Sequence, residues 1–427
     1  MKVSFFTLGC KVNTCETEYL REQFIKRGYE AVEGEKADVF VVNSCTVTHI
    51  ADRKGRGIVR KLRRENPSSI IILTGCMPQI NKEDAFNLKE ADIVLGNGEK
   101  DKLFSYLDDF LNRRERIFAV GDIFKVKDIA TMSASKFDPS FQKAYLKIED
   151  GCDNFCTYCA IGFARGRVRS ESIADIQKDA DKFIKEGYKE LILTGINLSR
   201  YGFDLGLKAS DGIRAVCERE GDFRVRLGSV EPNLMDIRDF EAMRDLPKLC
   251  PHFHLALQSG CDETLKRMGR RYTTKEYMSF VDYIFKYFPN PSITTDIIVG
   301  FPGETEDEFK KTCRFVSEIP FLKANIFPYS PRLGTRAASF PDQIHPDIKK
   351  ERNIILNEIA ETKKIEFLKT QLGREARVLG EKTGTGYTDN YVNVSFGEEK
   401  PKAGDFSIVK LSEITSDGMT AHIIKNR

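Results

Sequence analysis

The chain has 427 residues, more than a single hydrophobic core usually accommodates, so two or three domains are expected. Hydrophobic residues make up 41% and charged residues 31%, and the apolar runs are too short for a membrane span, which predicts a globular protein. The net charge of +3 excludes a uniformly basic nucleic-acid binder, so any surface of that kind must be local.

The N-terminus and the cysteine content indicate the compartment. The first residues, MKVSFFTLGCKVN, contain a brief apolar run followed by Lys11 and no small-residue cleavage site. We therefore expect a cytoplasmic protein without membrane attachment. Eleven cysteines, an odd number, argue against a disulfide framework and favour metal binding or buried thiols.

The first segment alternates predicted strands and helices. We expect strands at 3–8, 38–43, 69–75 and 91–98, and helices at 16–29 and 53–66. Apolar strands separated by helices predict an open parallel sheet covered by helices, which we assign to a domain at residues 1–124. Residues 125–143 are polar and irregular and are expected to form a linker.

Three cysteines of this first segment follow predicted strands. Cys10, Cys45 and Cys76 each stand just past the carboxyl end of one strand. Ligand sites of open α/β sheets form at that edge, so the three thiols are expected to share one site. The alternative is that each is a small buried residue at a strand end.

A second α/β run follows the linker. Six strands are expected at 144–149, 190–197, 223–232, 253–260, 292–304 and 322–330. With the helices between them they predict a partial, TIM-like (β/α)6 barrel at residues 138–372, which a long charged helix at 347–373 closes. Short alternating segments with glycine-rich turns predict a small antiparallel β-barrel at residues 373–427.

The stretch GCDNFCTYCAIGFARGR at 151–167 places Cys152, Cys156 and Cys159 in one loop. Structural zinc requires four ligands, and catalytic zinc usually uses histidine or carboxylate ligands. A four-iron cluster can use three cysteines and keep one iron free for a small molecule. The alternative is a zinc site that His252 or His254 completes.

These three cysteines resemble the cluster motif of radical S-adenosylmethionine enzymes. The resemblance implies that the free iron holds S-adenosylmethionine and that one electron cleaves this cofactor to a 5′-deoxyadenosyl radical. It further implies cofactor contacts from polar residues at the ends of the barrel strands. These residues are Thr194, Gly195 and Asn197 in LTGIN, Ser229 and Glu231 in GSVEP, and Gln258 in LQSG. Tyr158 would pack near the adenine, or would serve only as a loop-packing aromatic.

The resemblance extends over the whole chain to the methylthiotransferases. The matching stretches are TLGCKVN (7–13), NSCTVT (43–48), LTGCMPQ (73–79), GCDNFCTYCAI (151–161), ARGRVRS (164–170), LQSGCDETLKRM (257–268), TTDIIVGFPGETEDEF (294–309) and FPYSPRLGT (327–335). The family implies a second [4Fe-4S] cluster on Cys10, Cys45 and Cys76, and identifies the C-terminal barrel as an RNA-binding type called TRAM. One S-adenosylmethionine would methylate sulfur at this auxiliary cluster. The radical from a second would remove hydrogen from a substrate carbon, and the methylthio group would replace it. A reducing electron donor of the flavodoxin or ferredoxin type is implied, and no stable protein partner is evident.

The stretches TLGCKVN, CTVT and ADRKGR (51–56) most resemble the branch that acts on N6-threonylcarbamoyladenosine (t6A) at position 37 of the tRNA anticodon stem-loop. The alternatives within the family are isopentenyladenosine 37 or a ribosomal-protein aspartate. Outside it, an iron–sulfur redox or sensor protein or a zinc-bearing RNA-binding module would also use such cysteines.

Basic residues provide candidate substrate contacts. Seven Lys/Arg lie within 53–64, among them Arg53, Lys54 and Arg56, and would face the anticodon-stem phosphates unless they are only a solvated helix face. A carboxylate on the threonylcarbamoyl group would pair with one of Arg165, Arg167 and Arg169. From residue 373 onward eight Lys/Arg balance eight Asp/Glu, so the barrel would bind RNA only through a local patch, with Tyr387 and Tyr391 stacking on bases.

Overall fold

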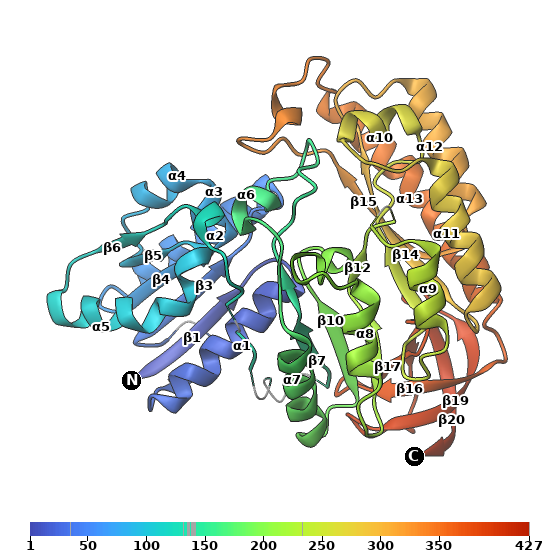
Figure 1. Cartoon of the computed structure of the whole chain (residues 1–427), viewed down its shortest axis with the longest axis horizontal. Helices are drawn as coiled ribbons and strands as arrows, with labels where there is room; N and C mark the ends of the chain where they lie inside the picture. The colour runs from blue at the N-terminus through green and yellow to red at the C-terminus, as the bar shows by residue number, and fades with distance from the viewer. Residues whose placement is uncertain (35, 131, 135–136, 138–141, 233, 427) are drawn as a thin grey trace.

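The computed structural model describes residues 1–427 except 35, 131, 135–136, 138–141, 233 and 427. Three sheet-based units follow one another along the chain (Figure 1). The predicted start of the second domain at 138 and part of the predicted linker lie outside the described residues, and the three domain boundaries stay predictions. In the part of the chain described, no helix combines the length and apolar character needed to cross a membrane.

The first unit is a parallel sheet of six strands in the order β2-β1-β3-β4-β5-β6. Its strands are β1 (Lys2–Thr7), β2 (Glu30–Ala31), β3 (Val39–Ser44), β4 (Ile70–Gly75), β5 (Ile93–Leu95) and β6 (Ile117–Ala119). Its helices are α1 (Lys11–Lys26), α2 (His49–Glu65), α3 (Cys76–Ile80), α4 (Lys82–Asn87) and α5 (Leu103–Arg113), with 3-10 turns η1 (Asn97–Lys102) and η2 (Ile123–Lys125).

Alternation along β3 explains the layers on both faces of this sheet. Val39 and Val41 pack in one apolar cluster with residues of α1 and α5, whereas Phe40 and Val42 pack in another with residues of α2. A strand buried on both faces reads as a continuous apolar run, as the sequence of β3 does. The predicted open parallel sheet is therefore confirmed.

Two details of the first unit differ from the prediction. The edge strands β2 and β6 have two and three residues, too few for a periodic pattern. Helix α1 begins at Lys11, five residues before the predicted start, because Cys10 is its extended N-cap and Val12 and Cys15 are buried by the first turns.

The second unit is the partial barrel. Its strands are β7 (Ala144–Lys147), β10 (Glu190–Thr194), β11 (Arg224–Leu227), β12 (Ser229–Val230), β13 (His252–Leu255), β14 (Ser292–Val299) and β15 (Phe321–Pro328). They form the parallel sheets β11-β10-β7 and β12-β13-β14-β15. Only Gly228 separates β11 from β12, so the two sheets join as the predicted six-stranded arrangement.

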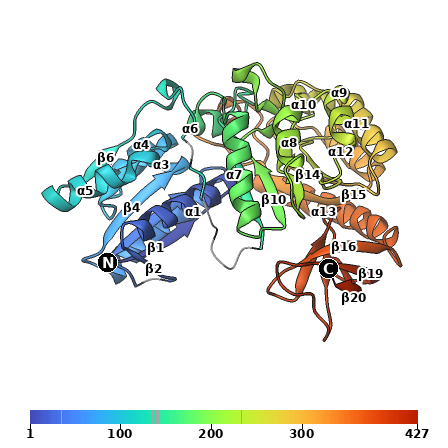
Figure 2. The same cartoon turned by 60° about the horizontal axis from the view of Figure 1, so that its bottom comes forward.

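Helices cover the outer side of these strands (Figure 2). They are α7 (Ile173–Lys185), α8 (Ala209–Cys217), α9 (Ile237–Arg244), α10 (Asp262–Met268), α11 (Thr274–Tyr287), α12 (Glu306–Glu318) and the long α13 (Pro346–Lys369). Shorter elements are the antiparallel pair β8 (Glu149–Asp150) and β9 (Arg169–Ser170), α6 (Ile161–Arg165), η3 (Leu198–Arg200), η4 (Phe203–Leu205) and η5 (Arg336–Ser339).

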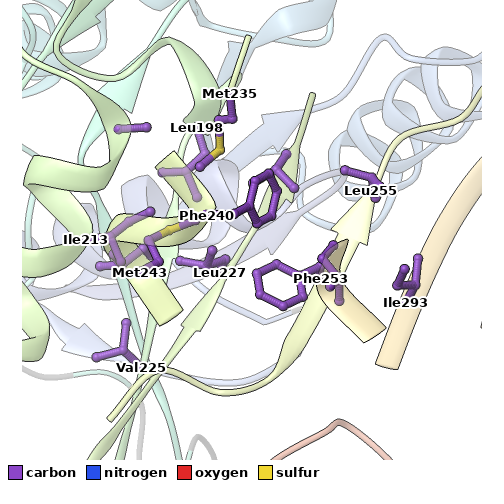
Figure 3. Packing of buried hydrophobic residues seen from close by; sticks show 14 of the residues in the cluster. Leu198, Ile213, Val225, Leu227, Met235, Phe240, Met243, Phe253, Leu255 and Ile293 are labelled. Atoms are coloured by element: carbon purple, nitrogen blue, oxygen red, sulfur yellow. The ribbon is translucent and has the colours of Figure 1, made fainter. Parts of the chain in front are cut away.

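Alternation also fixes which side chains of the barrel strands face the helices. Figure 3 shows Val225 and Leu227 of β11 in the apolar layer with Ile213 of α8 and Phe240 and Met243 of α9. The intervening Arg224 and Arg226 therefore point to the inside of the barrel. The interior of the barrel is thus polar, while its outer layer is the largest hydrophobic core of the protein.

The third unit is a closed barrel in the order β16-β17-β18-β20-β19. Its strands are β16 (Glu375–Gly380), β17 (Thr385–Thr388), β18 (Asn393–Ser395), β19 (Phe406–Ile414) and β20 (Met419–Asn426). The barrel was predicted as antiparallel, but β18 and β20 pair in parallel, because closure joins strands that a hairpin does not connect. It attaches to the interior of the larger barrel, where Arg224 donates to the Tyr387 carbonyl and Arg226 to the Asp389 carbonyl, at 2.9 and 3.0 Å.

Candidate active site

The loop with Cys152, Cys156 and Cys159 lies between β8 and α6, at the carboxyl ends of the barrel strands. All three cysteines line a cavity of about 330 Å³. The same cavity receives polar side chains from the ends of four different strands. These side chains are Asn197 after β10, Glu231 after β12, Gln258 after β13 and Asp296 in β14. The structure therefore brings most of the predicted cofactor residues to one place.

Asn197 connects the cysteine loop to the end of β10. Its backbone N–H donates to Glu149 Oε2 at 2.7 Å, and its side-chain amide donates to Cys152 Sγ at 3.5 Å. Its Oδ1 is buried and accepts no hydrogen bond from the described residues. A buried acceptor without a partner at the wall of a cavity fits a ligand that brings a donor, such as an amino group.

Glu231 faces the cavity in an ion pair with Arg270. Arg270 is buried and also donates to Cys156 Sγ at 3.3 Å. Sequence reasoning missed Arg270, because an arginine in the polar run GRRYTT gives no sign that it turns inward. The pair offers a carboxylate to ligand hydroxyl or amino groups and a cation to a ligand carboxylate.

Of the other predicted cofactor residues, Tyr158 and Gln258 line the cavity, whereas Thr194 and Gly195 do not. Tyr158 lines the cavity and meets Phe301 edge-on, with ring centroids 6.4 Å apart. Gln258 has a positive φ of 67°, a rare backbone conformation outside glycine, and its N–H and carbonyl bond to Asp296 and Ile298 of β14. Thr194 is buried at the end of β10, and neither Thr194 nor the adjacent Gly195 lines the cavity.

Ser229 is also absent from the cavity wall. Its side chain is exposed on β12, in register with His254 of β13.

Cys10, Cys45 and Cys76 lie together at the carboxyl edge of the first sheet. Cys10 is the N-cap of α1, Cys45 follows β3, and Cys76 is the first residue of α3. Gly75 makes this turn possible, because it has a φ of +102° and a Cβ there would lie 2.3 Å from the Ser44 carbonyl oxygen. Burial, together with the neighbouring thiols of Cys76 and Cys10, raises the pKa of Cys45 to about 11. The three thiols therefore influence one another electrostatically, and their use as one ligand site stays a prediction.

The segment after Cys45 reaches the cavity that Cys152, Cys156 and Cys159 line, although Cys10, Cys45 and Cys76 themselves do not line it. Val47 and Thr48 lie two and three residues after Cys45, and both line the cavity together with Cys152 and Cys156. Residues from the first sheet and from the barrel thus form one site.

The chemistry of the thiols in the Cys152–Cys159 loop fits an iron–sulfur cluster. Burial raises the pKa of Cys152 to about 11 and of Cys159 to about 12, so loading of a cluster must displace their protons. Among the described residues no three acidic, histidine or cysteine groups converge on one metal ion. In a cluster each thiolate ligates a different iron, so the sulfurs need not converge. His252 and His254, which would complete a zinc site, instead each bond to Thr294 Oγ1 at 3.0 Å.

Two of the three predicted substrate arginines need correction. Arg165 is 1% exposed and pairs with Glu16 at 2.5 Å, and Arg169 is 5% exposed and donates to the Arg165 carbonyl at 2.9 Å. Neither lines the cavity, because acidic residues of the protein interior hold them. Arg167 alone is exposed, with a weak ion pair to Asp153 at 3.7 Å.

The predicted basic helix and tyrosines are also placed. Arg53 and Lys54 are exposed on α2, and Arg56 pairs with Asp84 at 3.1 Å. Tyr391 stacks between Tyr387 and His252, with ring centroids 4.8 and 4.3 Å away. The prediction that Tyr391 stacks on an RNA base is therefore wrong, because protein rings already cover both of its faces.

Family models match both α/β units. Residues 146–316 match the radical SAM superfamily, and residues 2–96 match the uncharacterized protein family UPF0004. A radical SAM domain uses S-adenosylmethionine and a [4Fe-4S] cluster, which agrees with the three-cysteine cavity. A solved radical S-adenosylmethionine methyltransferase, TsrM from Kitasatospora setae, shares the fold with a TM-score of 0.59 over 79% of this chain and 76% of that one, at 12% identity.

Relatives match over nearly the full length. The threonylcarbamoyladenosine tRNA methylthiotransferases MtaB of Aquifex aeolicus and Thermotoga maritima are 39% and 38% identical, covering 92% and 97% of this chain and 96% and 95% of theirs. A tRNA-2-methylthio-N(6)-dimethylallyladenosine synthase of Clostridium botulinum is 35% identical, with 98% and 96% covered. On these matches over nearly its whole length, the chain belongs to the radical S-adenosylmethionine methylthiotransferase family of enzymes.

Proposed function

We propose that this enzyme adds a methylthio group to C2 of t6A at position 37 of tRNA. The relatives named for threonylcarbamoyladenosine are 39% and 38% identical, and one named for dimethylallyladenosine is 35% identical. The matches at 36–39% identity all carry the threonylcarbamoyl name, which supports that substrate, although two further relatives with that name are 33% and 32% identical. Because tRNA is the proposed substrate, we also place the enzyme in the cytoplasm.

The observation that carries this proposal is the cavity lined both by the loop after Cys45 and by the Cys152–Cys159 loop. Val47 and Thr48 extend the segment of Cys45 to the wall that Cys152 and Cys156 also line. A redox sensor needs its cysteines but has no need of a cavity that segments of both α/β units line. Transfer of sulfur to a carbon radical needs both sets beside one substrate, since the reacting atoms must approach within contact distance.

We propose that Cys10, Cys45 and Cys76 hold a second [4Fe-4S] cluster and that Cys152, Cys156 and Cys159 hold the first. When bound, the two clusters and S-adenosylmethionine supply a carbon radical and a methylated sulfur. The first cluster requires an external reductant, which we propose is a protein of the flavodoxin or ferredoxin type.

The chain's own residues position the cofactor and substrate. The Arg270–Glu231 pair and the free Oδ1 of Asn197 offer complementary groups to the charged end of S-adenosylmethionine. Val47 and Phe327 are 55% and 46% exposed and line the cavity, so they offer an apolar rim to a base. Arg167 remains the candidate partner for the threonylcarbamoyl carboxylate, and Arg53 and Lys54 for the stem phosphates.

Mass spectrometry of tRNA nucleosides from a deletion strain tests the substrate. We expect the methylthio form of t6A to disappear and unmodified t6A to accumulate, with recovery on complementation. Loss of the methylthio isopentenyl form instead, with methylthio-t6A unchanged, would show that the substrate assignment is wrong.

A further inference from the structure

Asn97, at the start of η1, contacts both cysteine-bearing segments. Its Nδ2 donates to Cys76 Sγ at 3.6 Å and to the Ala164 carbonyl at 2.8 Å. Ala164 belongs to α6, the short helix that directly follows the Cys152–Cys159 loop. One amide therefore joins a ligand of the N-terminal set to the segment that carries the other set.

The orientation of this amide is fixed by its surroundings. The Asn97 backbone N–H donates to Gln79 Oε1 at 2.9 Å, and Gln79 lies on α3, which begins with Cys76. The close approach depends on Gly96, where a Cβ would lie 2.4 Å from that same oxygen. Both side-chain contacts of Asn97 are acceptors, so the NH2 group must face them.

Such a contact acts on the electrons of the sulfur. An N–H donor stabilises negative charge on a cysteine thiolate, and hydrogen bonds to sulfur are among the determinants of cluster reduction potential. Added negative charge on reduction is then better tolerated, so the potential is higher with the donor than without it. A residue that only braced the fold would leave the potential unchanged.

We propose that Asn97 is a positioning residue for the auxiliary site, setting both the reduction potential of the cluster on Cys10, Cys45 and Cys76 and its placement against α6. This inference rests on the proposed second cluster. It does not depend on which nucleoside is the substrate.

The test measures the auxiliary cluster alone. Full-length protein carrying Cys152→Ala, Cys156→Ala and Cys159→Ala is reconstituted with iron and sulfide without oxygen and titrated potentiometrically with detection by electron paramagnetic resonance. In that background Asn97→Leu and Asn97→Asp are expected to move the potential to more negative values, Asn97→Asp further because it places a negative charge beside sulfur. Asn97→Gln, which keeps an amide donor, is expected to restore part of the shift.

Asn66→Leu is the matched control. Its amide donates to the Leu62 carbonyl at the end of α2, at 3.2 Å, and its removal is expected to leave the potential unchanged. Unchanged potentials in both Asn97→Leu and Asn97→Asp, at full iron content, would overturn the role of Asn97 and leave the second cluster standing. An iron-free N-terminal site in the background protein would overturn both together.

A second measurement uses the enzyme with all six cysteines. Asn97→Leu is expected to raise the ratio of 5′-deoxyadenosine to methylthiolated product, because the radical forms while sulfur delivery is impaired. An unchanged ratio would contradict the placement part of the proposal even if the variant loads less iron.

Discussion

The two cysteine sets are built in opposite ways. Cys152, Cys156 and Cys159 belong to one loop, so their proximity is a local property of the chain. Cys10, Cys45 and Cys76 follow three different strands and meet only because β1, β3 and β4 are parallel and end at one edge. The first set thus depends on a loop and the second on a whole sheet, and a change in the first sheet should remove sulfur transfer before it removes radical formation.

A buried charge network ties the two sets together. Glu16, on the helix that begins after Cys10, pairs with Arg165 on the helix that follows Cys159 and with Lys100 of η1. Burial alone would raise the pKa of Glu16, but Arg165 and Lys100 outweigh it and hold the pKa well below its usual range. The arginine expected at the substrate instead lies between the two cysteine sets.

Removing a ligand of the loop set, Cys152, Cys156 and Cys159, should have the largest effect. Cys156→Ala is expected to abolish both cleavage of S-adenosylmethionine and methylthiolation, because the only radical source is lost. Chromatography with mass detection of 5′-deoxyadenosine and of tRNA nucleosides measures both. Cys313→Ala, outside both sets, is the control and should retain both activities; product from Cys156→Ala would contradict the assignment.

Removing a ligand of the set that the sheet positions, Cys10, Cys45 and Cys76, should separate cleavage of S-adenosylmethionine from methylthiolation. Cys45→Ala is expected to lose methylthiolated product but to keep cleavage of S-adenosylmethionine, since the barrel loop is untouched. The same two assays give the result. Cys15→Ala is the control, because Cys15 lies on α1 close to Cys10 but its thiol donates to the Tyr145 carbonyl, at 3.5 Å. Equal loss of both activities in Cys45→Ala would mean that the two sites do not function separately.

The contrast between local and long-range assembly also sets what the sequence could predict. Spacing revealed Cys152, Cys156 and Cys159, and strand-end positions revealed Cys10, Cys45 and Cys76, because each depends on a regular element or a short loop. Six barrel strands were predicted for the same reason, since alternation and apolar runs are local patterns.

Contacts between residues far apart in the sequence left no such local pattern. Arg165 bonds to Glu16 across a separation of 149 residues, and Arg270, between α10 and α11, reaches Glu231 after β12. The parallel pairing of β18 with β20 arises from closure of the barrel, and the early start of α1 from burial of Val12 and Cys15. Each of these depends on tertiary packing, which overrides local propensity.

The network itself should be worth a measurable part of the stability. Arg165→Met leaves Glu16 with one fewer buried cation and is expected to lower the free energy of unfolding by about 3–5 kcal/mol. Denaturant titration measures the loss. Arg167→Met, two residues away but 70% exposed, is expected to change it by less than about 1 kcal/mol. Equal effects would mean that Glu16 and Arg165 do not form a buried pair in solution.

The pH dependence follows from the lowered pKa of Glu16. A carboxylate whose folded pKa is depressed contributes stability above its unfolded pKa of about 4.3, and this contribution is lost as the pH falls toward the folded value. The difference between wild type and Arg165→Met should therefore be full at neutral pH and shrink below about pH 4.

The smallest effect is expected at the surface of α2. Arg53→Ala with Lys54→Ala should weaken tRNA binding on the order of tenfold or less and reduce the slope of log affinity against log salt by about 2, because two phosphate contacts are removed. Lys178→Ala with Lys185→Ala, exposed on α7, removes the same charge elsewhere and should leave the slope unchanged.

Asp52, adjacent to Arg53, is buried in an ion pair with Arg332, so α2 is anchored beside the cavity whose wall includes Thr48. An unaltered slope would mean that this face of α2 is only solvated and that the anticodon stem binds elsewhere. An altered slope with an unchanged ratio of 5′-deoxyadenosine to product would show that the N-terminal unit, which carries Cys10, Cys45 and Cys76, binds the RNA as well as the sulfur.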